Sequence, residues 1–560
     1  MNKKRTALSW DLALAKKVKY SILALSLLGL LYSALGAFFA LVSKDVVDSA
    51  VSAAAGEGLE NLGRLCVFLA VLLVVQLAMQ VAISELSVRM TGKLVIICKK
   101  KLFSSLIHKE AAQVLKYHTG ELLNRLTSDV SVVSGTISTL VPDIVHYLTR
   151  VLASFVVLFM LDKEIALLSL VALPIVFFAS RIYRKKIKSL HKRVQESDGK
   201  TRSFMQETLA NLLVVKSFGN ESRVTGDATG LQIDNYRLNL KKNHISILSN
   251  LMFFVAMTAG YYFAMAWGAY KIAVGLMSVG TLTAILQLVE QLQAPFRNLS
   301  SVMPQYYAMI ASTERIMELL DLPEEKTPDA DFDRDKIFEN ARELCVENVT
   351  FSYGEKTVLQ NVSFRLKKGE FAAVTGLSGA GKSTLLKLFL GIFEPENGEI
   401  YLLTESGENV KLDAKTRSLF AYVPQGNLIL SGTIRENVCF GKDNATEEDI
   451  IRAVKAAGIW EEIKKLPAGL DTMLGEGGLG LSEGQVQRLA IARAVMYDAP
   501  ILLLDECTSA LDEQTEKEVL DNLIALGKTC LTVSHKAAAK ECCGVNFYVE
   551  NGSVYRIEKN

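Results

Sequence analysis

The sequence predicts a helical membrane domain joined to an α/β nucleotide-binding domain built around a phosphate-binding loop. Three observations predict this fold class. First, several apolar stretches in residues 1–320 are long enough to cross a bilayer, which takes about 20 residues in a helix. Second, after an acidic segment at 321–335, the pattern changes to short β-rich runs. Third, the segment 376–384, GLSGAGKST, lies between a strand-like run and a helical run.

Composition and charge support a division into two parts. Half of the 560 residues are apolar, and the mean hydropathy of +0.24 is high for a soluble protein. Residues 1–320 hold 35 Lys/Arg and 21 Asp/Glu, a net charge of +14, whereas residues 321–560 hold 27 and 39, a net charge of −12. This composition excludes a disordered chain, a fibrous repeat and a disulfide scaffold. The eight cysteines show no metal-ligand spacing, and we interpret them as free thiols in a reducing compartment.

Six membrane-spanning helices are predicted in the first part of the chain. The apolar stretches cover 21–43, 65–84, 144–161, 165–180, 245–270 and 279–310. The sixth is expected to continue beyond the membrane as a helix, because Arg315 and Glu318 keep the helical pattern.

Basic residues determine the expected orientation. They are concentrated before the first span and in 181–193, so the positive-inside rule places the leader, 86–140 and 181–243 in the cytoplasm. Six crossings then return the C-terminal half to the same side. We expect an integral protein of a bacterial plasma membrane, with both termini and the nucleotide-binding domain in the cytoplasm.

The predicted domains are a membrane domain over 1–320, an acidic linker over 321–340 and a nucleotide-binding domain over 341–560. Pro323, Pro328 and the acidic residues of the linker favour this division. The two cytoplasmic excursions of the membrane domain have helical spacing and almost no Gly or Pro. We interpret them as membrane helices that extend into the cytoplasm and contact a partner; the alternative is solvated helices with no partner.

The segment 376–384 has the G-x-x-x-x-G-K-[ST] spacing of a phosphate-binding loop between the strand-like run 371–375 and the helical run 385–390. Glycines allow backbone N–H groups to curl around phosphates, and the helix N-terminus adds a favourable dipole. Lys382 supplies a positive charge to the β- and γ-phosphates, and Ser383 offers a hydroxyl to Mg²⁺. The predicted ATP-binding residues of the loop are Gly376, Ser378, Gly379, Gly381, Lys382, Ser383 and Thr384.

A second apolar run, 501–504, ends in two carboxylates. A buried strand reaching Asp505 would hold Mg²⁺ through that side chain or its water shell. Glu506, one residue later, is placed to orient or deprotonate the attacking water. The alternative is a core strand with a capped end, which is credible only if the phosphate loop is ignored.

Residues 481–485, LSEGQ, lie upstream of Asp505 and closely resemble the LSGGQ signature of the ATP-binding-cassette (ABC) ATPases. Further motifs of that family follow in order. The resemblance implies that Tyr353 stacks on adenine, that Gln425 contacts Mg²⁺ and the attacking water, and that His535 contacts the γ-phosphate. Asp512, in the segment SALD, matches the family's D-loop.

The same resemblance implies a head-to-tail dimer closing on two ATP molecules. In the family, the signature, here Ser482, Gly484 and Gln485, meets the nucleotide held by the opposing subunit. One residue departs from the pattern, since Glu483 replaces glycine, and a carboxylate near phosphate is unfavourable unless it points outward. Because Glu506 and His535 are both present, we interpret the site as competent for hydrolysis.

The first half of the chain resembles the membrane domain of ABC exporters. Segments 116–129 and 206–219 look like the two intracellular loops of that family, which implies short transverse helices near 116–120 and 206–211 that contact the nucleotide domains. Arg150, Glu290 and Gln287 are costly in lipid, so each is a candidate either for substrate contact or for interhelical pairing.

The implied function is ATP-driven transport by a half-transporter acting as a homodimer or heterodimer. Alternating access from inward-facing to outward-facing states would export a small molecule, a lipid or a peptide. Two alternatives stay open: an importer on the same fold, and a membrane-anchored ATPase that gates or signals without transport. We expect ATP and Mg²⁺ as cofactors, contact with the bilayer, and no nucleic-acid partner.

Overall fold

The computed structural model describes residues 2–54, 59–169, 181–327, 332–426, 429–442, 444–475, 478 and 480–557. The chain divides into two compact units, which we call the helical unit and the sheet unit. The helical unit comprises Met1–Leu106 and Thr119–Asp321. The sheet unit comprises Ile107–His118 and Leu322–Asn560, so a short segment from the first half of the sequence belongs to it.

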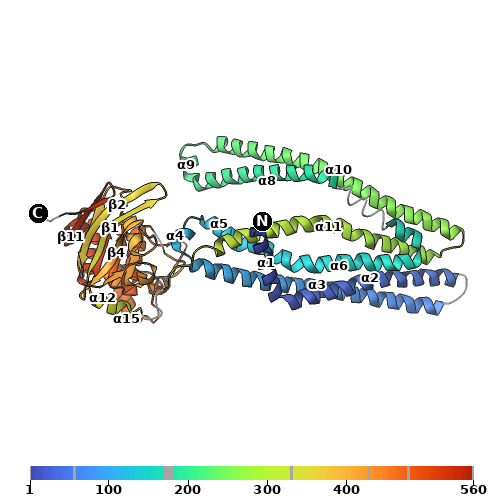
Figure 1. Cartoon of the computed structure of the whole chain (residues 1–560), viewed down its shortest axis with the longest axis horizontal. Helices are drawn as coiled ribbons and strands as arrows, with labels where there is room; N and C mark the ends of the chain where they lie inside the picture. Colours follow the sequence, from blue (N-terminus) through green and yellow to red (C-terminus); the bar gives the residue numbers. More distant parts are fainter. Residues whose placement is uncertain are drawn as a thin grey trace. The chain divides into compact units, whose positions relative to one another are not determined.

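The helical unit is built from helices, most of them long (Figure 1). They are α1 (Asn2–Lys17), α2 (Lys19–Ala54), α3 (Leu59–Ile107), α5 (Thr119–Asn124), α6 (Val130–Leu161), α8 (Arg181–Ala210), α9 (Leu212–Ser217), α10 (Glu221–Ala273) and α11 (Val279–Leu320). A π-helical turn, Arg125–Asp129, joins α5 to α6. The helix α11 reaches Leu320, which confirms the predicted continuation of the sixth apolar stretch.

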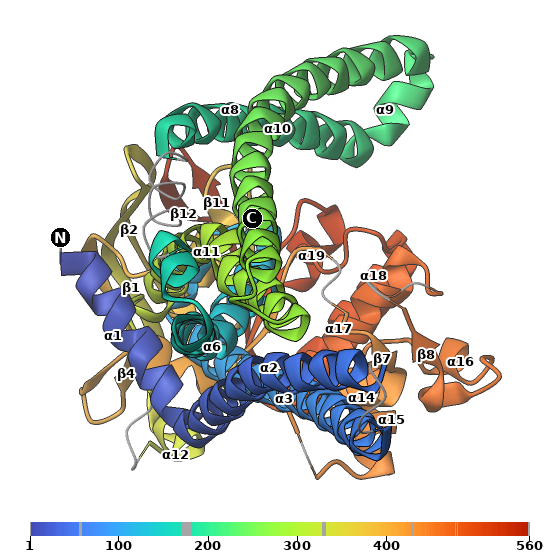
Figure 2. The same ribbon diagram turned by 90° about the vertical axis from the view of Figure 1, so that its right-hand side faces the viewer.

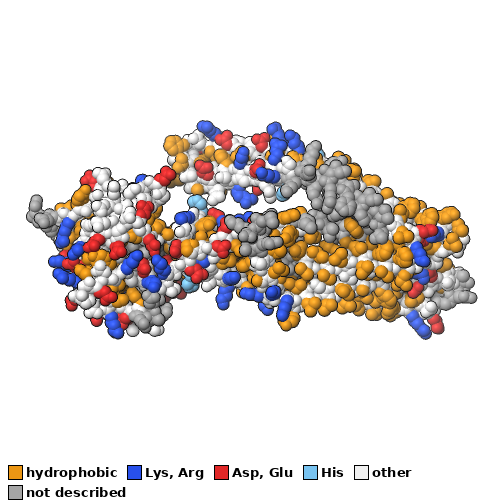
Figure 3. Space-filling view, in the orientation of Figure 1, with side chains coloured by type: hydrophobic (Ala, Val, Ile, Leu, Met, Phe, Trp, Pro, Cys, Tyr) orange, Lys and Arg blue, Asp and Glu red, His pale blue; other side chains and the backbone are white. Residues whose placement is uncertain are grey.

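Five of the six predicted spans lie within these helices, and the remaining one, 165–180, lies mostly outside the described residues. Among the described residues, three helical segments are long and apolar enough to cross a membrane. These are Lys19–Ala54, Glu60–Ile107 and Thr119–Leu161. Figure 3 shows hydrophobic side chains over much of the visible surface of these long helices, as expected of helices that face lipid.

Polar contacts join α2, α6 and α11 within the helical unit. Gln291 of α11 donates from Nε2 to the carbonyl of Gly36 at 3.0 Å, and Ser33 of α2 lies 2.9 Å from Nδ1 of His146. Of the three polar candidates in the sequence, Arg150 and Gln287 are half-buried, and Glu290 is exposed in the single chain. An exposed carboxylate on a membrane helix favours a position facing a cavity or a second subunit.

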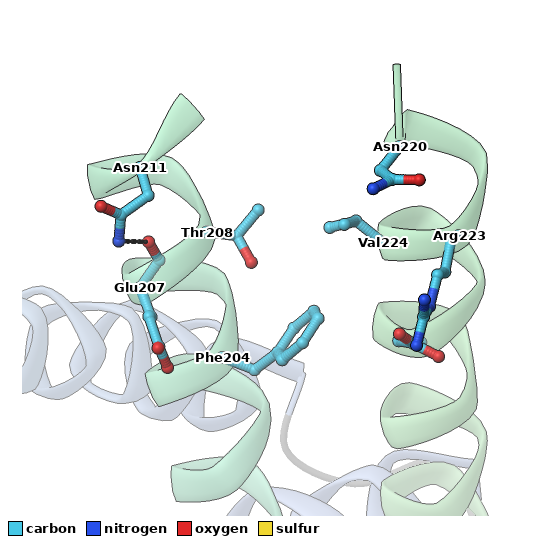
Figure 4. Close-up of a pocket in the computed structure, with 8 residues that line it drawn as sticks. Phe204, Glu207, Thr208, Asn211, Asn220, Arg223 and Val224 are labelled. Carbon is cyan, nitrogen blue, oxygen red and sulfur yellow. Dashed lines mark hydrogen bonds between the residues drawn. The ribbon is translucent and has the colours of Figure 1, made fainter. Parts of the chain in front are cut away.

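The second predicted excursion, 181–243, belongs to a helical hairpin. Helices α8 and α10 run side by side and the short α9 closes their end (Figures 1 and 2). A shallow pocket lies near this end, where Phe204 and Thr208 of α8 face Val224 of α10 (Figure 4). Side chains such as Arg223 that line the pocket are largely exposed.

The predicted positions of the transverse helices require correction. The expected segment 206–211 belongs mainly to α8, and the separate helix α9 begins at Leu212 because Asn211 leaves helical geometry at φ −109°. Likewise the short helix of the first excursion is α4 (Ala111–Val114), before the expected 116–120. Sequence spacing identified both loops but placed their short helices about one turn away.

The sheet unit contains twelve strands among its described residues. They are β1 (Ala341–Tyr353), β2 (Lys356–Lys367), β3 (Phe371–Gly376), β4 (Asn397–Thr404), β5 (Asn409–Lys411), β6 (Phe420–Val423), β7 (Gly432–Thr433), β8 (Met473–Leu474), β9 (Ile501–Asp505), β10 (Thr529–Val533), β11 (Val545–Glu550) and β12 (Ser553–Ile557). An antiparallel sheet has the order β2-β1-β4-β5, and a six-stranded sheet has the order β12-β11-β3-β10-β9-β6. Strands β11, β3, β10, β9 and β6 are parallel, whereas β12 is antiparallel to β11.

The central strands are buried on both faces. All five residues of β9 are buried, and successive side chains alternate between two hydrophobic clusters: Leu502 and Leu504 join one, while Ile501 and Leu503 join the other. This explains why 501–504 is a continuous apolar run rather than an alternating one. The carboxyl ends of parallel strands share one edge, and the motif residues Gly376 and Asp505 both lie at that edge.

Besides α4, the sheet unit contains further helices among its described residues. They are α12 (Arg334–Glu339), α13 (Lys382–Phe389), α14 (Ile434–Val438), α15 (Glu447–Ala456), α16 (Trp460–Ile463), α17 (Glu483–Tyr497), α18 (Glu513–Ala525) and α19 (Ala537–Cys542). Short 3₁₀ helices cover Ala414–Leu419 and Gly469–Asp471. The strand at 371–376 followed by a helix from Lys382 confirms the predicted arrangement around the phosphate-binding loop.

Candidate ATP site

The loop between β3 and α13 has a backbone that only glycine accommodates at two positions. Gly376 has φ +146°, and a Cβ there would lie 2.2 Å from the carbonyl oxygen of Val549. Gly381, the N-cap of α13, has φ +103°, and a Cβ there would lie 2.9 Å from Leu359 and Val358. Because no side chain fits at these two positions, backbone N–H groups at the N-terminus of α13 are open to a ligand. Such a helix N-terminus favours an anion. Ser378 and Gly379 are exposed in the same loop.

Lys382 crosses beneath this loop. Its side chain is buried, and Nζ donates to the carbonyls of Gly376 at 3.0 Å and Leu377 at 2.9 Å. Burial lowers the pKa of the Lys382 ammonium, while the charges of Glu506 and Asp505 act in the opposite direction. A desolvated cation held only by carbonyl dipoles gains strongly from an arriving phosphate.

Asp505 ends β9 as a buried carboxylate with two donors. Ser383 Oγ donates to Oδ1 at 2.9 Å, and the Tyr422 hydroxyl donates to Oδ2 at 3.2 Å. Burial raises the pKa of Asp505, whereas the two hydrogen bonds lower it. The hydroxyl, the carboxylate and the nearby amide of Gln425 are hard oxygen donors, the type that Mg²⁺ prefers, so this donor set fits that ion.

Tyr422 was not among the predicted site residues. It lies in β6, which pairs in parallel with β9 so that Tyr422 stands opposite Leu503. Its position three residues before Gln425 was visible in the sequence, but the strand order that places it beside Asp505 was not. Burial, followed by contact with Asp505, raises the pKa of Tyr422, so the hydroxyl stays protonated and remains a donor.

Replacing Tyr422 with phenylalanine removes one donor from the buried carboxylate and changes little else in shape. We expect the Mg²⁺ concentration for half-maximal ATP hydrolysis to change about 3- to 10-fold, in line with the net contribution of roughly 0.5–1.5 kcal/mol from one hydrogen bond. The measurement is a Mg²⁺ titration of hydrolysis, with Tyr555→Phe at an exposed tyrosine as control. If Tyr422→Phe and the control need the same Mg²⁺ concentration for half-maximal hydrolysis, Tyr422 has no role in Mg²⁺ binding.

Glu506 lies between two other predicted residues. Gln425 Nε2 donates to Glu506 Oε2 at 2.7 Å, and His535 Nε2 lies 3.2 Å from Oε1. The backbone of Glu506 is in the left-handed region at φ +49°, and its N–H donates to the carbonyl of Val533 at 3.0 Å. Such a conformation is unfavourable for a residue with a side chain and is frequent at functional sites. The structure thus brings together the three residues predicted to be catalytic.

Tyr353 stands at the edge of the loop region. Its hydroxyl lies 3.3 Å from Thr384 Oγ1, and its ring makes edge-to-face contacts with Phe351 and Phe393, with centroids 5.0 and 5.4 Å away. The side chain is 44% exposed, so part of the ring is open to a ligand. A fixed and partly exposed aromatic ring is suited to stacking on a planar base.

The signature residues begin α17. Ser482 is the N-cap, and it forms a reciprocal capping box with Gln485: the Ser482 N–H donates to Gln485 Oε1 at 2.8 Å. Glu483 is the first residue of the helix and is exposed. A carboxylate at a helix N-terminus is stabilised by the helix dipole, which offsets the unfavourable charge expected from the sequence.

The signature contacts the D-loop of the same chain. A Cβ at Gly484 would lie 3.2 Å from the carbonyl oxygen of Ala510, so the two segments are close. Gln487 Nε2 donates to Ser509 Oγ at 2.8 Å, and its Oε1 accepts from the Ala510 N–H at 3.0 Å. Asp512 caps α18 by accepting from the Thr515 N–H at 3.0 Å.

The polar side chains of the signature pair with each other. Within the part of the chain that the structure describes, the side-chain hydrogen bonds of Ser482 and Gln485 are with each other, and none reaches residues 376–384.

Comparison with known proteins identifies the family. Residues 20–296 match the family described as ABC transporter transmembrane region, and residues 359–509 match the family described as ABC transporter. The chain is 31% identical over 468 residues to the ATP-dependent lipid A-core flippase of Desulfotalea psychrophila, covering 81% of this chain and 79% of that protein. This chain belongs to the ABC transporter family. In it, an exporter-type membrane domain and the ABC ATPase are fused.

Two further similarities extend this result. The transporter is 31% identical over 456 residues to ABC transporter B family member 1 of Dictyostelium discoideum, covering 78% of this chain and 48% of that protein, and so spans about half of that relative's length. A solved structure, described as a bacterial Atm1-family ABC exporter with ATP bound, superposes with a TM-score of 0.78 at 23% identity, covering 96% of this chain and 94% of that one. This similarity concerns the fold.

The transporter binds ATP and couples its hydrolysis to export, and its membrane domain makes it an integral membrane protein of bacterial type. Sequence reasoning predicted Lys382, Ser383, Asp505, Glu506, Gln425 and His535, which the structure gathers in one region. It missed Tyr422 and Gln487, whose contacts depend on strand order and on the packing of α17.

Proposed function

We propose that the transporter acts as a dimer in which each of two ATP sites combines the phosphate loop of one chain with the signature of the other. The observation that carries the ATPase assignment is the placement of Glu506 between Gln425 and His535, next to the Ser383–Asp505 pair. The dimer is supported by the signature, in which Gly484 lies close to the D-loop of the same chain and Ser482 is exposed.

Each residue of the site has a defined task in this proposal. Tyr353 stacks on adenine, the loop N–H groups and Lys382 bind the phosphates, and Glu506 accepts a proton from the attacking water. His535 and Gln425 hold the carboxylate of Glu506 in place by the bonds described above. Ser383, Asp505 and Gln425 would hold Mg²⁺, which supplies charge neutralisation of the phosphates when bound.

The proposed topology follows the basic residues of the sequence. Both termini and the ATPase lie in the cytoplasm, and α3, α8 and α10 extend into it. ATP binding would close the dimer, and the long helices would carry that change as rigid bodies to the membrane spans. Hydrolysis would then reset the transporter.

The proposed cargo is a molecule of the lipid class. Several relatives are named ATP-dependent lipid A-core flippases, among them the proteins of Desulfotalea psychrophila and Syntrophus aciditrophicus. The helical unit supports this class, because three of its helical segments are apolar enough to cross a membrane and α11 carries the polar side chains Glu290 and Gln287. Such a surface suits a cargo with an apolar body and a polar head.

The test is transport by the purified chain in proteoliposomes with the ATPase facing outward. Fluorescent lipid A and a fluorescent phosphatidylethanolamine serve as probes, and their leaflet distribution is followed with and without ATP. ATP-dependent movement into the inner leaflet, which corresponds to export, supports the proposal. Movement in the opposite direction would indicate an importer. Vigorous ATP turnover with neither probe moved would favour an ATPase that gates or signals.

A further inference from the structure

Two segments that continue membrane-domain helices pair with each other inside the sheet unit. Residues Ile107–His118 continue α3 at one end and α5 at the other, and the segment from Leu322 continues α11. The Glu325 N–H donates to the His108 carbonyl at 2.9 Å, and the Glu110 N–H donates to the Pro323 carbonyl at 3.1 Å. These bonds form an isolated antiparallel bridge.

The linker strand of this bridge is fixed by an ion pair. Both carboxylate oxygens of Glu325 accept from Arg417, each at 2.8 Å, in a two-pronged arrangement. The side chains are only 23% and 34% exposed, which reduces screening of the pair by water. In the neighbouring pair, Lys326 Nζ lies 2.7 Å from a carboxylate oxygen of Glu394, and each of these two side chains is more than half exposed.

Arg417 also contacts the helix that carries the phosphate-binding residues. Its Nε donates to the carbonyl of Leu390, the C-cap of α13, at 2.8 Å. The N-terminus of the same helix holds Lys382 and Ser383, about two turns away along an eight-residue helix of about 12 Å. Helices are stiff at this length, so displacement of one end moves the other.

A second contact holds the C-terminal end of α13 against the segment that carries Arg417. Gly391, directly after α13, has φ +59°, and a Cβ there would lie 2.3 Å from backbone atoms of Asp413 and Ala414. The 3₁₀ helix Ala414–Leu419 that carries Arg417 is therefore packed against the end of α13, and it leads directly into β6 and on to Gln425. Arg417 thus lies between the linker and two segments of the ATP site.

From this arrangement we propose that Glu325 and Arg417 are positioning residues that couple the ends of α3, α5 and α11 to the phosphate-binding helix of the same chain. The position of the linker then sets the affinity for ATP. The inference rests on the proposed function, in which helix movement and ATP binding are linked. It adds a route through the linker, which pairs with the segment that carries α4 and is separate from α9.

The experiment uses the full chain in lipid nanodiscs and measures basal ATP hydrolysis without any cargo. The variants are Glu325→Arg, Arg417→Glu and the double reversal, with Lys326→Glu as the matched control in the same linker. We expect the KM for ATP to rise about 5-fold in Glu325→Arg and about 10-fold in Arg417→Glu, with kcat within about 2-fold. The larger effect follows because Arg417→Glu also loses the bond to Leu390.

The double reversal is expected to return the KM to within about 3-fold of the wild-type value, since the ion pair is restored and the Leu390 bond is not. Lys326→Glu should stay within about 2-fold, as expected of an exposed pair. Melting temperatures of all variants identify any that fail to fold. Wild-type KM in both single variants, or a folded double variant no better than Arg417→Glu, overturns the inference.

Failure of the positioning role can be distinguished from failure of the proposed function. If neither lipid probe moves but the pattern of KM values is as expected, the cargo proposal fails and the positioning role holds. If lipid movement is ATP-dependent but the KM values do not respond, only the positioning role fails.

Discussion

Replacing Glu506 with glutamine is expected to slow ATP hydrolysis by about 10³-fold, within the range usual for a general base. The amide keeps the size of the side chain and can still accept from Gln425, so the local geometry is preserved. It cannot accept a proton from water at neutral pH. ATP should therefore bind with nearly wild-type affinity and remain unhydrolysed.

Two measurements check this result: steady-state phosphate release, and equilibrium binding of a fluorescent ATP analogue. Glu513→Gln, an exposed glutamate at the start of α18, is the matched control and should hydrolyse ATP normally. Hydrolysis by Glu506→Gln within about 10-fold of wild type would remove Glu506 from the role of general base. Loss of binding instead would indicate that Glu506 supports the fold of the site.

Replacing Lys382 with alanine is expected to weaken ATP binding by about 100-fold, consistent with losing a charge-assisted contact of about 3 kcal/mol to phosphate. Among the described residues, the buried ammonium donates to two backbone carbonyls, and its N–H groups would turn to the phosphates when ATP arrives. The measurement is equilibrium ATP binding by the full chain in nanodiscs.

The control for this variant is Lys455→Ala, which removes an exposed lysine from α15. It should bind ATP as the wild type does. A melting temperature recorded in parallel shows whether Lys382→Ala is folded, because two carbonyl acceptors in the loop lose their donor. Unchanged ATP affinity in the folded Lys382→Ala protein would contradict the assignment of the loop.

Much of the site could be predicted because its chemistry requires fixed local spacing. Gly376, Gly381 and Lys382 lie within one short loop, where neighbouring residues determine backbone geometry. Asp505 and Glu506 follow a continuous apolar run, which is typical of a strand buried on both faces. In both places the local sequence carries the required information.

Other parts of the site depend on contacts between distant segments and could not be predicted in this way. Tyr422 reaches Asp505 because β6 pairs with β9, and nothing in either segment specifies that order. Arg417 contacts Glu325 across more than 90 positions of sequence. The short helices α4 and α9 were misplaced because helix ends depend on single residues such as Asn211, whose geometry the periodicity of apolar residues does not report.

The two hydrogen bonds of Gln487 have a consequence for how a dimer would use ATP. They fasten the start of α17 to Ser509 and Ala510, three and four residues after Glu506. In the proposed dimer, a nucleotide held by the other chain would contact the start of α17. A displacement of α17 would then shift the position of this chain's own Glu506 through the two bonds of Gln487. ATP binding at one site would then affect the other site. The rate of ATP hydrolysis should therefore increase with ATP concentration with a Hill coefficient above one.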